Sequence, residues 1–196
     1  MMNRALMLLA AVAVVAVVVI GLTQAGGSDS PGRSGGRFDL AAAQEDLAGA
    51  PAPLAALHDQ SNQLLEGGTA AFEARLRELR GHPVVINKWA SWCGPCRAEF
   101  PLFQQVATTR GKEIAFVGVN ARDKRPAAER FAATFPVPYP SYEDPSEQIA
   151  QKLKAPSNFP VTLFVDANGK TVFTHQGGYR SAADLSADID EHLGGP

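Results

Sequence analysis

The only two cysteines of this 196-residue chain, Cys93 and Cys96, are separated by two residues. Two thiols at this spacing can bind a metal ion, form a structural disulfide, or open and close a disulfide as chemistry. A zinc site usually needs about four ligands, and a disulfide across so short a loop would constrain the unfolded chain little. The histidines offer no second ligand pair, because they are scattered singly: His58, His82, His175 and His192. The sequence therefore favours thiol–disulfide exchange.

A helix is predicted to begin at Cys93 and to continue over residues 94–109. Cys96 would then lie almost one turn further on, close enough to Cys93 for a disulfide. The helix dipole and the free backbone N–H groups at this end favour a thiolate on Cys93, and Pro95 suits the first turn. We therefore expect Cys93 to be an exposed, acidified nucleophile and Cys96 to be a buried resolving thiol.

Alternating strands and helices surround the cysteine pair. We expect buried strands over residues 84–87 and 114–120, an edge strand over 139–144, and a hairpin over 161–175 that turns at Asn168-Gly169. Further helices are predicted over residues 70–80, 126–135, 146–153 and 181–193, the first capped by Thr69 and ended by Gly81. This alternation, closed by a hairpin, indicates an α/β fold with a central mixed sheet.

The chain has three predicted regions. Residues 5–22 carry no charge, and this length is nearer to a membrane span of about 20 residues than to the shorter core of a cleaved signal peptide. We therefore favour an uncleaved anchor over residues 1–24, with a cleaved signal as the alternative. Residues 25–37 form a Gly/Ser-rich linker, and residues 38–196 are long enough for one folded domain. Its first part, residues 38–66, predicts one short helix and then an irregular segment.

The formal net charge is −2, and the chain has no basic run. This composition gives no support for nucleic-acid binding. We expect a monomer with no metal and no cofactor beyond the redox disulfide Cys93–Cys96.

The segment WCGPC, residues 92–96, follows a predicted buried strand and opens a helix, and it resembles the active site of the thioredoxin superfamily. The longer segments VVINKWASWCGPCRAEFP and FPVTLFVDANGK resemble the membrane-anchored thiol–disulfide oxidoreductases of the TlpA/ResA/DsbE type. This resemblance covers about residues 80–193. It implies a thioredoxin-like fold with a strand–helix insert over about 136–153. Residues 38–79 depart from the usual family start, where a β-hairpin is expected.

The resemblance also assigns roles around the dithiol. Cys93 would be the nucleophile, and Cys96 would resolve the mixed disulfide. Trp92 before the pair and Gly94-Pro95 between the cysteines would contact the substrate. Trp92 would cover the site as an aromatic flap, the alternative being an ordinary packing tryptophan.

A cis-proline is expected to face the dithiol, and Pro160 matches it, with Pro156 as the rival position. Its cis bond would expose the backbone of Phe159 to pair with a substrate chain. Family members usually have a smaller residue than Phe159 there.

Glu99 lies six residues after the first cysteine, where the TlpA/ResA type carries a glutamate beneath the site. A partly buried carboxyl of raised pKa can exchange protons with a thiol, whereas the alternative is a solvated helix carboxylate. Plain thioredoxins have an aspartate where this chain has Asn87, and an amide cannot relay a proton. Lys88, where the family usually has an apolar residue, has no functional explanation in the sequence.

The dipeptide Gly94-Pro95 is of the reducing, thioredoxin type. The sequence therefore predicts a reductant exported by its anchor, in a disulfide-permissive compartment, with a membrane electron donor of the CcdA/DsbD type. The resemblance implies that its substrate is the pair of heme-binding cysteines of apocytochrome c. The alternatives are a general extracytoplasmic reductase or oxidant of other protein disulfides, and a non-catalytic thiol module that binds a metal or a partner.

Overall fold

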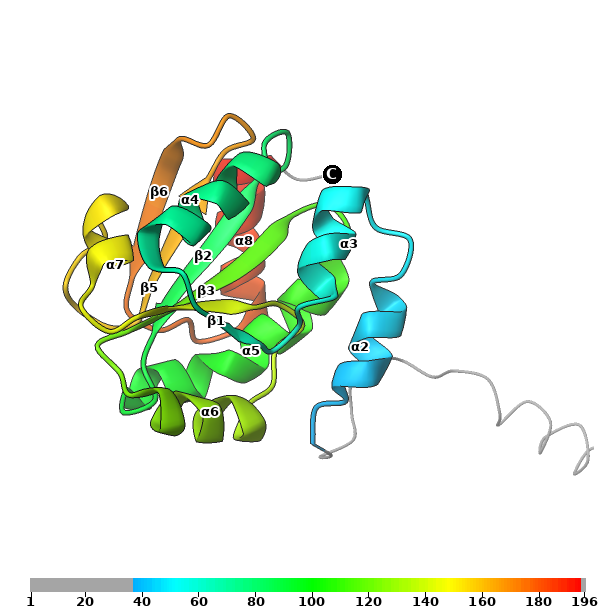
Figure 1. Cartoon of the computed structure of the whole chain (residues 1–196). Helices are drawn as coiled ribbons and strands as arrows, with labels where there is room; N and C mark the ends of the chain where they lie inside the picture. The colour runs from blue at the N-terminus through cyan, green and yellow to red at the C-terminus, as the bar shows by residue number, and fades with distance from the viewer. Residues whose placement is uncertain (1–36, 195–196) are drawn as a thin grey trace, which may run out of the picture. The chain divides into compact units, whose positions relative to one another are not determined.

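The computed structural model describes residues 37–194, and this part of the chain is built around a mixed six-stranded sheet (Figure 1). The strands are β1 (Leu64–Leu65), β2 (Val84–Trp89), β3 (Ala115–Ala121), β4 (Ser141–Asp144), β5 (Val161–Val165) and β6 (Thr171–Gln176). Their spatial order is β1-β4-β3-β2-β5-β6. The first four of these neighbours pair in parallel, while β5 and β6 form an antiparallel hairpin that is also antiparallel to β2.

Helices cover both faces of the sheet (Figure 1). They are α2 (Leu40–Asp46), α3 (Ala52–His58), α4 (Gly68–Glu78), α5 (Gly94–Arg110), α6 (Arg125–Thr134), α7 (Gln148–Lys152) and α8 (Ala182–Leu193). Side chains of α5, α6 and α8 share one hydrophobic cluster, and those of α3, α4 and α7 share the other. The described part is thus a sheet between two helical layers, in agreement with the predicted α/β fold.

Strand β2 leads into the cysteine pair and is buried along its whole length. Because successive side chains of a strand point to opposite faces, Val85 and Trp89 lie in the cluster beneath α5, whereas Val84 and Ile86 lie in the cluster beneath α4 and α7. By the same alternation Asn87 faces α5, and its neighbour Lys88 faces the other layer.

The predicted insert forms the strand β4 and the helix α7, but β4 is not an edge strand. Two residues, Leu64 and Leu65, pair in parallel with Ser141 and Tyr142 and cover that side of β4. The prolines before β4 are compatible with this position, because the strand begins only at Ser141.

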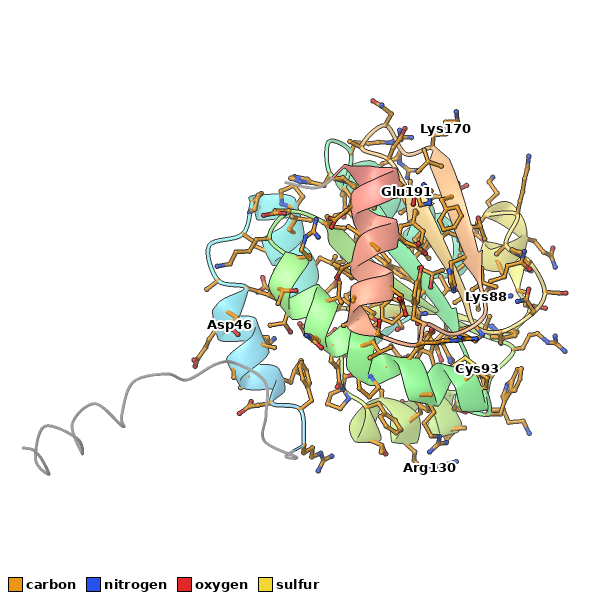
Figure 2. The ribbon with its side chains drawn as sticks, turned by 180° about the vertical axis from the view of Figure 1, so that it is seen from behind. Asp46, Lys88, Cys93, Arg130, Lys170 and Glu191 are labelled. Carbon is orange, nitrogen blue, oxygen red and sulfur yellow. A yellow bond between two sulfur atoms is a disulfide. The ribbon has the colours of Figure 1, made fainter. Side chains whose placement is uncertain are left out.

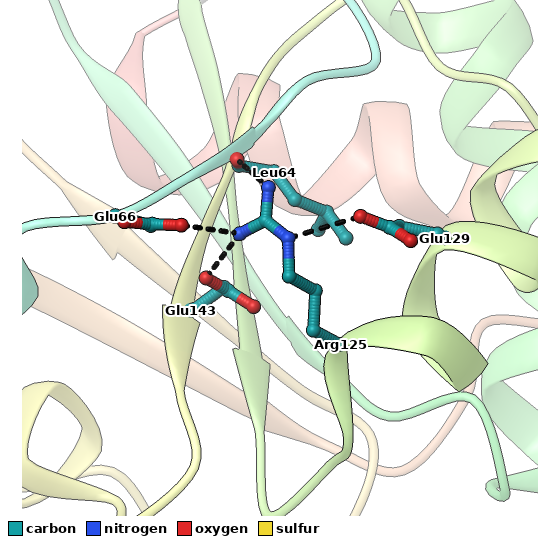
Figure 3. Close-up of polar contacts among 5 residues, drawn as sticks. All are labelled: Leu64, Glu66, Arg125, Glu129 and Glu143. Carbon is teal, nitrogen blue, oxygen red and sulfur yellow. Dashed lines mark hydrogen bonds and ion pairs between the residues drawn. The ribbon is translucent and has the colours of Figure 1, made fainter.

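Arg125 ties this short outer strand to the rest of the domain (Figure 3). Its guanidinium donates to Glu66 at 3.0 Å, to Glu143, to Glu129 at 2.9 Å and to the Leu64 carbonyl at 3.5 Å. One side chain of α6 therefore links β1 to β4, although Leu64 and Arg125 are far apart in the sequence.

Residues 38–66 hold two helices rather than one. Pro51 and Pro53, which suggested an irregular segment, stand at the N-cap and in the first turn of α3, where a proline needs no backbone N–H partner. The following helix, α4, has Gly67 as its N-cap with no side-chain hydrogen bond, so the predicted cap at Thr69 is wrong. Helices nevertheless stand where the family usually begins with a β-hairpin, as the sequence indicated.

The hairpin forms at the predicted turn, with Gly169 at φ 76°. The Asp166 carboxylate accepts the backbone N–H groups of Asn168 and Lys170 and so closes the loop. Ser181 caps α8 by accepting the N–H of Asp184.

The anchor predicted over residues 1–24 and most of the linker lie outside the described residues. Within residues 37–194, no helix is both long enough and apolar enough to cross a membrane.

Candidate active site

The two cysteines form a disulfide at the N-terminus of α5. The sulfur atoms are 2.08 Å apart and the Cα atoms 5.3 Å apart. Cys93 is the N-cap residue, and its Sγ accepts the backbone N–H of Cys96 at 3.1 Å. In the reduced protein this N–H and the helix dipole would stabilise a thiolate on Cys93.

The burial of the pair differs from the prediction in one respect. Cys96 is fully buried, as expected, but Cys93 is also buried, with only 4% of its surface exposed to solvent. In this oxidised state its sulfur is bonded to the buried Cys96, and Cys93 belongs to the hydrophobic cluster beneath α5.

Trp92, the residue directly before Cys93, pairs with a second aromatic side chain, Phe159. Trp92 is 56% exposed, which excludes an ordinary core position, and its Nε1 donates to the Arg122 carbonyl at 2.9 Å. Its ring meets the ring of Phe159 edge to face, with centroids 5.0 Å apart. A Cβ atom added at Gly94 would meet no atom within 4 Å, so this position at the start of α5 is not packed against the rest of the domain.

The Phe159–Pro160 peptide bond is cis, as the resemblance implies. Pro156 is the wrong candidate, because the Phe159–Pro160 bond is the one cis bond found within residues 37–194. The carbonyl of Pro160 accepts the N–H of Gly177 at 3.0 Å, which holds the proline against the end of β6.

Glu99 lies one turn below the cysteines on α5 and is fully buried. Burial raises the pKa of its carboxyl to about 7, against the opposing effect of hydrogen bonds from Asn87 and Tyr179. Asn87 Nδ2 donates to Oε1 at 2.8 Å, and the backbone N–H of Tyr179 donates to Oε2 at 3.3 Å. A solvated helix carboxylate is therefore the wrong interpretation of Glu99, and the group can change its charge near neutral pH.

Tyr179 is a site residue that sequence reasoning missed. Its side chain packs in the cluster beneath α5, its ring stacks on His175 with centroids 4.0 Å apart, and its hydroxyl donates to Asp188 Oδ2 at 2.6 Å. Nothing in the sequence marks a backbone N–H as a partner of Glu99. The adjacent Gly177-Gly178 pair was the available signal, since a side chain at Gly178 would lie 3.7 Å from Glu99 Oε2.

A second missed residue, Asp123, holds the loop that precedes the cysteines. Its carboxylate accepts the backbone N–H and the hydroxyl of Ser91, the amide of Asn120 and the backbone N–H of Lys124. Burial alone would raise the pKa of Asp123, but these hydrogen bonds outweigh it and lower the pKa. Asp123 therefore fixes the chain directly before Trp92.

Lys88, unexplained in the sequence, is 1% exposed and has three partners. Its Nζ donates to the Pro156 carbonyl, lies 3.6 Å from Glu147 Oε1, and stands 4.2 Å from the centroid of the Phe159 ring. Desolvation lowers the pKa of Lys88, and Glu147 opposes this effect. The side chain thus reaches from the far face of the sheet to the residue before the cis-proline.

Within residues 37–194, no group of three or more His, Cys, Asp or Glu side chains is placed to hold a metal ion. A parallel sheet with an antiparallel hairpin, a disulfide at the start of the helix after a central strand, and a cis-proline together define a thioredoxin-like thiol–disulfide oxidoreductase.

Residues 48–189 match the model of the Redoxin family, and the chain belongs to that family. It is 29% identical over 124 residues to the thiol-disulfide oxidoreductase ResA of Geobacillus kaustophilus, covering 62% of this chain and 67% of that protein. It is 34% identical over 93 residues to the thiol:disulfide interchange protein DsbE of Pseudomonas fluorescens, covering 47% of this chain and 50% of that protein.

A crystal structure of a thiol:disulfide interchange protein DsbE from Chlorobium tepidum has a similar fold. It is 32% identical, with a TM-score of 0.51, and the match covers 57% of this chain and 78% of that chain. The chain thus spans between half and two thirds of the length of the two curated relatives, and the solved structure supports the predicted thioredoxin-like fold.

Proposed function

We propose that this protein is an extracytoplasmic thiol–disulfide oxidoreductase that works as a reductant. The observation that carries the proposal is the Cys93–Cys96 disulfide at the N-terminus of α5, with the carboxyl of Glu99 buried beneath it. Its similarity to ResA and DsbE proteins supports the same reaction class.

The reaction begins with the reduced pair. The Cys93 thiolate attacks one sulfur of a substrate disulfide, which forms a mixed disulfide and releases the other substrate sulfur as a thiolate. Cys96 then gives up its proton and attacks Sγ of Cys93. This second step releases the substrate's remaining thiol and leaves the Cys93–Cys96 disulfide, so two electrons pass from the protein to the substrate.

Glu99 is suited to take the proton of Cys96. The two residues are three positions apart on α5 and therefore share a helix face, and both are fully buried. Burial raises the pKa of Glu99 from its ordinary value to about 7, so the carboxyl can take up or release a proton near neutral pH. A group with a pKa near the working pH is an effective proton acceptor and donor.

The reducing direction rests on Gly94-Pro95, the thioredoxin-type pair, because thioredoxin lies near about −270 mV and the oxidant DsbA near about −120 mV. We infer that the protein is exported from the apolar run over residues 5–22. As a membrane anchor, this run would keep the domain beside a membrane electron donor of the CcdA/DsbD type. By the resemblance to the TlpA/ResA/DsbE type, the proposed substrate is the heme-binding cysteine pair of apocytochrome c.

Two measurements test this function. The reduced chain is expected to reduce insulin and a Cys-X-X-Cys-His peptide disulfide, and Cys93→Ser is expected to abolish both activities. No activity in the wild-type chain, together with stoichiometric metal binding, would refute the redox function. A potential above about −180 mV would refute the reducing direction.

The substrate is identified by trapping. In Cys96→Ser the second step cannot occur, so the mixed disulfide on Cys93 should persist. Apocytochrome c recovered in that disulfide would support the proposed substrate, whereas recovery of other exported proteins in its place would indicate a general reductase.

A further inference from the structure

A closed ring of five residues includes Trp92, the residue directly before Cys93, and Lys88 is its buried member. A buried ammonium is costly unless it is paired, and Lys88 is paired on three sides, by the Pro156 carbonyl, by Glu147 and by the face of Phe159. The contact with Phe159 is a cation–π interaction, which gains strength when the cation is desolvated.

A chain of contacts leads from Phe159 through Trp92 and Arg122 to Glu147, and so back to Lys88. The Phe159 ring meets the Trp92 ring at 5.0 Å, and Trp92 Nε1 donates to the Arg122 carbonyl at 2.9 Å. Arg122 Nε lies 3.7 Å from Glu147 Oε2, and Glu147 Oε1 lies 3.6 Å from Lys88 Nζ. We call Lys88, Phe159, Trp92, Arg122 and Glu147 the rim ring. It joins β2, the cis-proline loop, the cysteine motif, the loop after β3 and the residue that caps α7.

The backbone conformation of two members of the rim ring is also unusual. Arg122 and Glu147 are two of the four non-glycine residues with positive φ within residues 37–194, at 52° and 58°. Such residues rarely adopt this conformation, and it persists where surrounding contacts impose it. The two residues whose side chains close the rim ring are therefore both held in unfavourable backbone conformations.

The rings of Trp92 and Phe159 are thereby fixed in place, and we call the surface that they form the apolar wall. Phe159 is held at its face by the ammonium of Lys88 and by a T-shaped contact with the ring of Trp92. Trp92 in turn is fixed by the hydrogen bond of its indole N–H, yet it stays 56% exposed directly before Cys93. An exposed aromatic surface whose conformational freedom is already lost can bind an apolar group with little further entropic cost.

We propose that Lys88 is a positioning residue for this wall, and that the wall selects substrate disulfides in which an aromatic or aliphatic side chain lies next to the attacked cysteine. This inference rests on the proposed thiol–disulfide exchange and identifies the substrate class of the same site. Lys88 acts through Phe159 and touches no reacting atom.

The test measures selectivity with two synthetic peptides. Each holds one intramolecular disulfide, and they differ only in the residue before the first cysteine, which is Leu in one and Ser in the other. The reduced full-length chain is expected to reduce the Leu peptide with about tenfold higher kcat/KM, which is within the range for an apolar side chain in a pocket. The difference is expected in KM, because the wall binds the flanking side chain and not the sulfur.

Lys88→Met removes the ammonium and keeps an apolar chain of similar length. It is expected to reduce the preference for the Leu peptide below about threefold, through a higher KM for that peptide. The matched control is Lys170→Met, which removes the same charge at the opposite end of the domain (Figure 2) and should keep the wild-type preference. Should Lys88→Met fail to fold, Phe159→Leu replaces it, since Phe159 is only partly buried. This variant should lose the preference for the Leu peptide to the same extent.

The outcomes separate this inference from the proposed function. A wild-type chain that reduces both peptides equally overturns the inference and leaves the exchange activity intact. A tenfold preference that survives in Lys88→Met overturns the role of Lys88. A wild-type chain that reduces neither peptide overturns the proposed function, and the inference falls with it.

Discussion

Replacing Glu99 with glutamine should change the stability of the oxidised protein in a direction that depends on pH. The side chain keeps its size, and its Oε1 can still accept the hydrogen bond from Asn87 Nδ2. Its amide nitrogen, however, faces the backbone N–H of Tyr179, which now donates to Oε2 at 3.3 Å. Two donors then oppose each other, at a cost of about 1 kcal/mol for a hydrogen bond of this length.

The carboxyl itself makes wild-type stability depend on pH. Its pKa is about 7 in the folded protein, against a model value of 4.5. The folded value is the higher one, so the contribution of Glu99 is fully present below about pH 4.5 and is lost as the pH rises through about 7. At about 1.4 kcal/mol for each pH unit between the two values, the loss amounts to about 3 kcal/mol.

Glu99→Gln should therefore be less stable than wild type by about 1 kcal/mol at pH 4.5 and more stable by about 2 kcal/mol at pH 8.5. Urea denaturation of both oxidised proteins measures this, and the disulfide keeps the cysteines from titrating. All other ionisable groups are common to the two proteins and cancel in the difference. A difference in unfolding free energy that is the same at both pH values would refute the assignment of a raised pKa to Glu99.

Three other changes test the surroundings of the site. Asn87→Ala removes a hydrogen bond that lowers the pKa of Glu99, so the midpoint of the pH-dependent loss of stability should move above about pH 7 in the same denaturation series. Asp123→Ala removes the acceptor of four hydrogen bonds and should cost about 2 kcal/mol of unfolding free energy at neutral pH, a moderate value because the carboxylate is partly exposed. Asp190→Ala, which removes an exposed carboxylate from its ion pair with Arg110, is the control and should change little. Gly118→Ala places a methyl group against Ser141 Oγ and Trp89 Nε1, breaks their 3.0 Å hydrogen bond, and should cost about 2–3 kcal/mol; a wild-type urea midpoint in this variant would contradict the close packing of β3 against β4.

Elements whose signals are local could be predicted from the sequence. Cys93 and Pro95 mark the start of α5, Pro126 marks the start of α6, and Asn168-Gly169 marks the hairpin turn. Each signal depends only on the backbone conformation of neighbouring residues, so no knowledge of the tertiary structure is needed. The cis bond before Pro160 is of another kind, because only the resemblance singled it out from Pro156.

Features that depend on distant contacts could not be predicted. Strand β1 has two residues, and it exists because β4 offers a free edge and Arg125 holds the Leu64 carbonyl. Similarly, the partners of Glu99 include the backbone N–H of Tyr179, eighty positions away in the sequence. Neither pairing leaves a pattern in the residues themselves, since a backbone group carries no residue type.

Lys88 illustrates the same limit in a side chain. In the sequence it is a charge in an otherwise apolar strand, and Phe159 is an oversized residue before a proline. Each departs from the family pattern, and neither has an evident reason alone. The structure joins them at 4.2 Å, so the two departures account for each other. A pair of unusual residues far apart in a chain is thus better interpreted together than singly.

Strand β2 carries both parts of the proposed site on consecutive residues. Asn87 points toward α5, where it donates to the Glu99 carboxyl that we propose as the proton acceptor, and Lys88 points to the other layer, where its ammonium lies over the Phe159 ring. Only the alternation of a strand places neighbours on opposite faces in this way. Both residues belong to one buried central strand that is paired on both sides. In the two proposals made above, proton transfer and substrate selection thus depend on the same strand, while the residues that each side chain positions come from separate loops and helices.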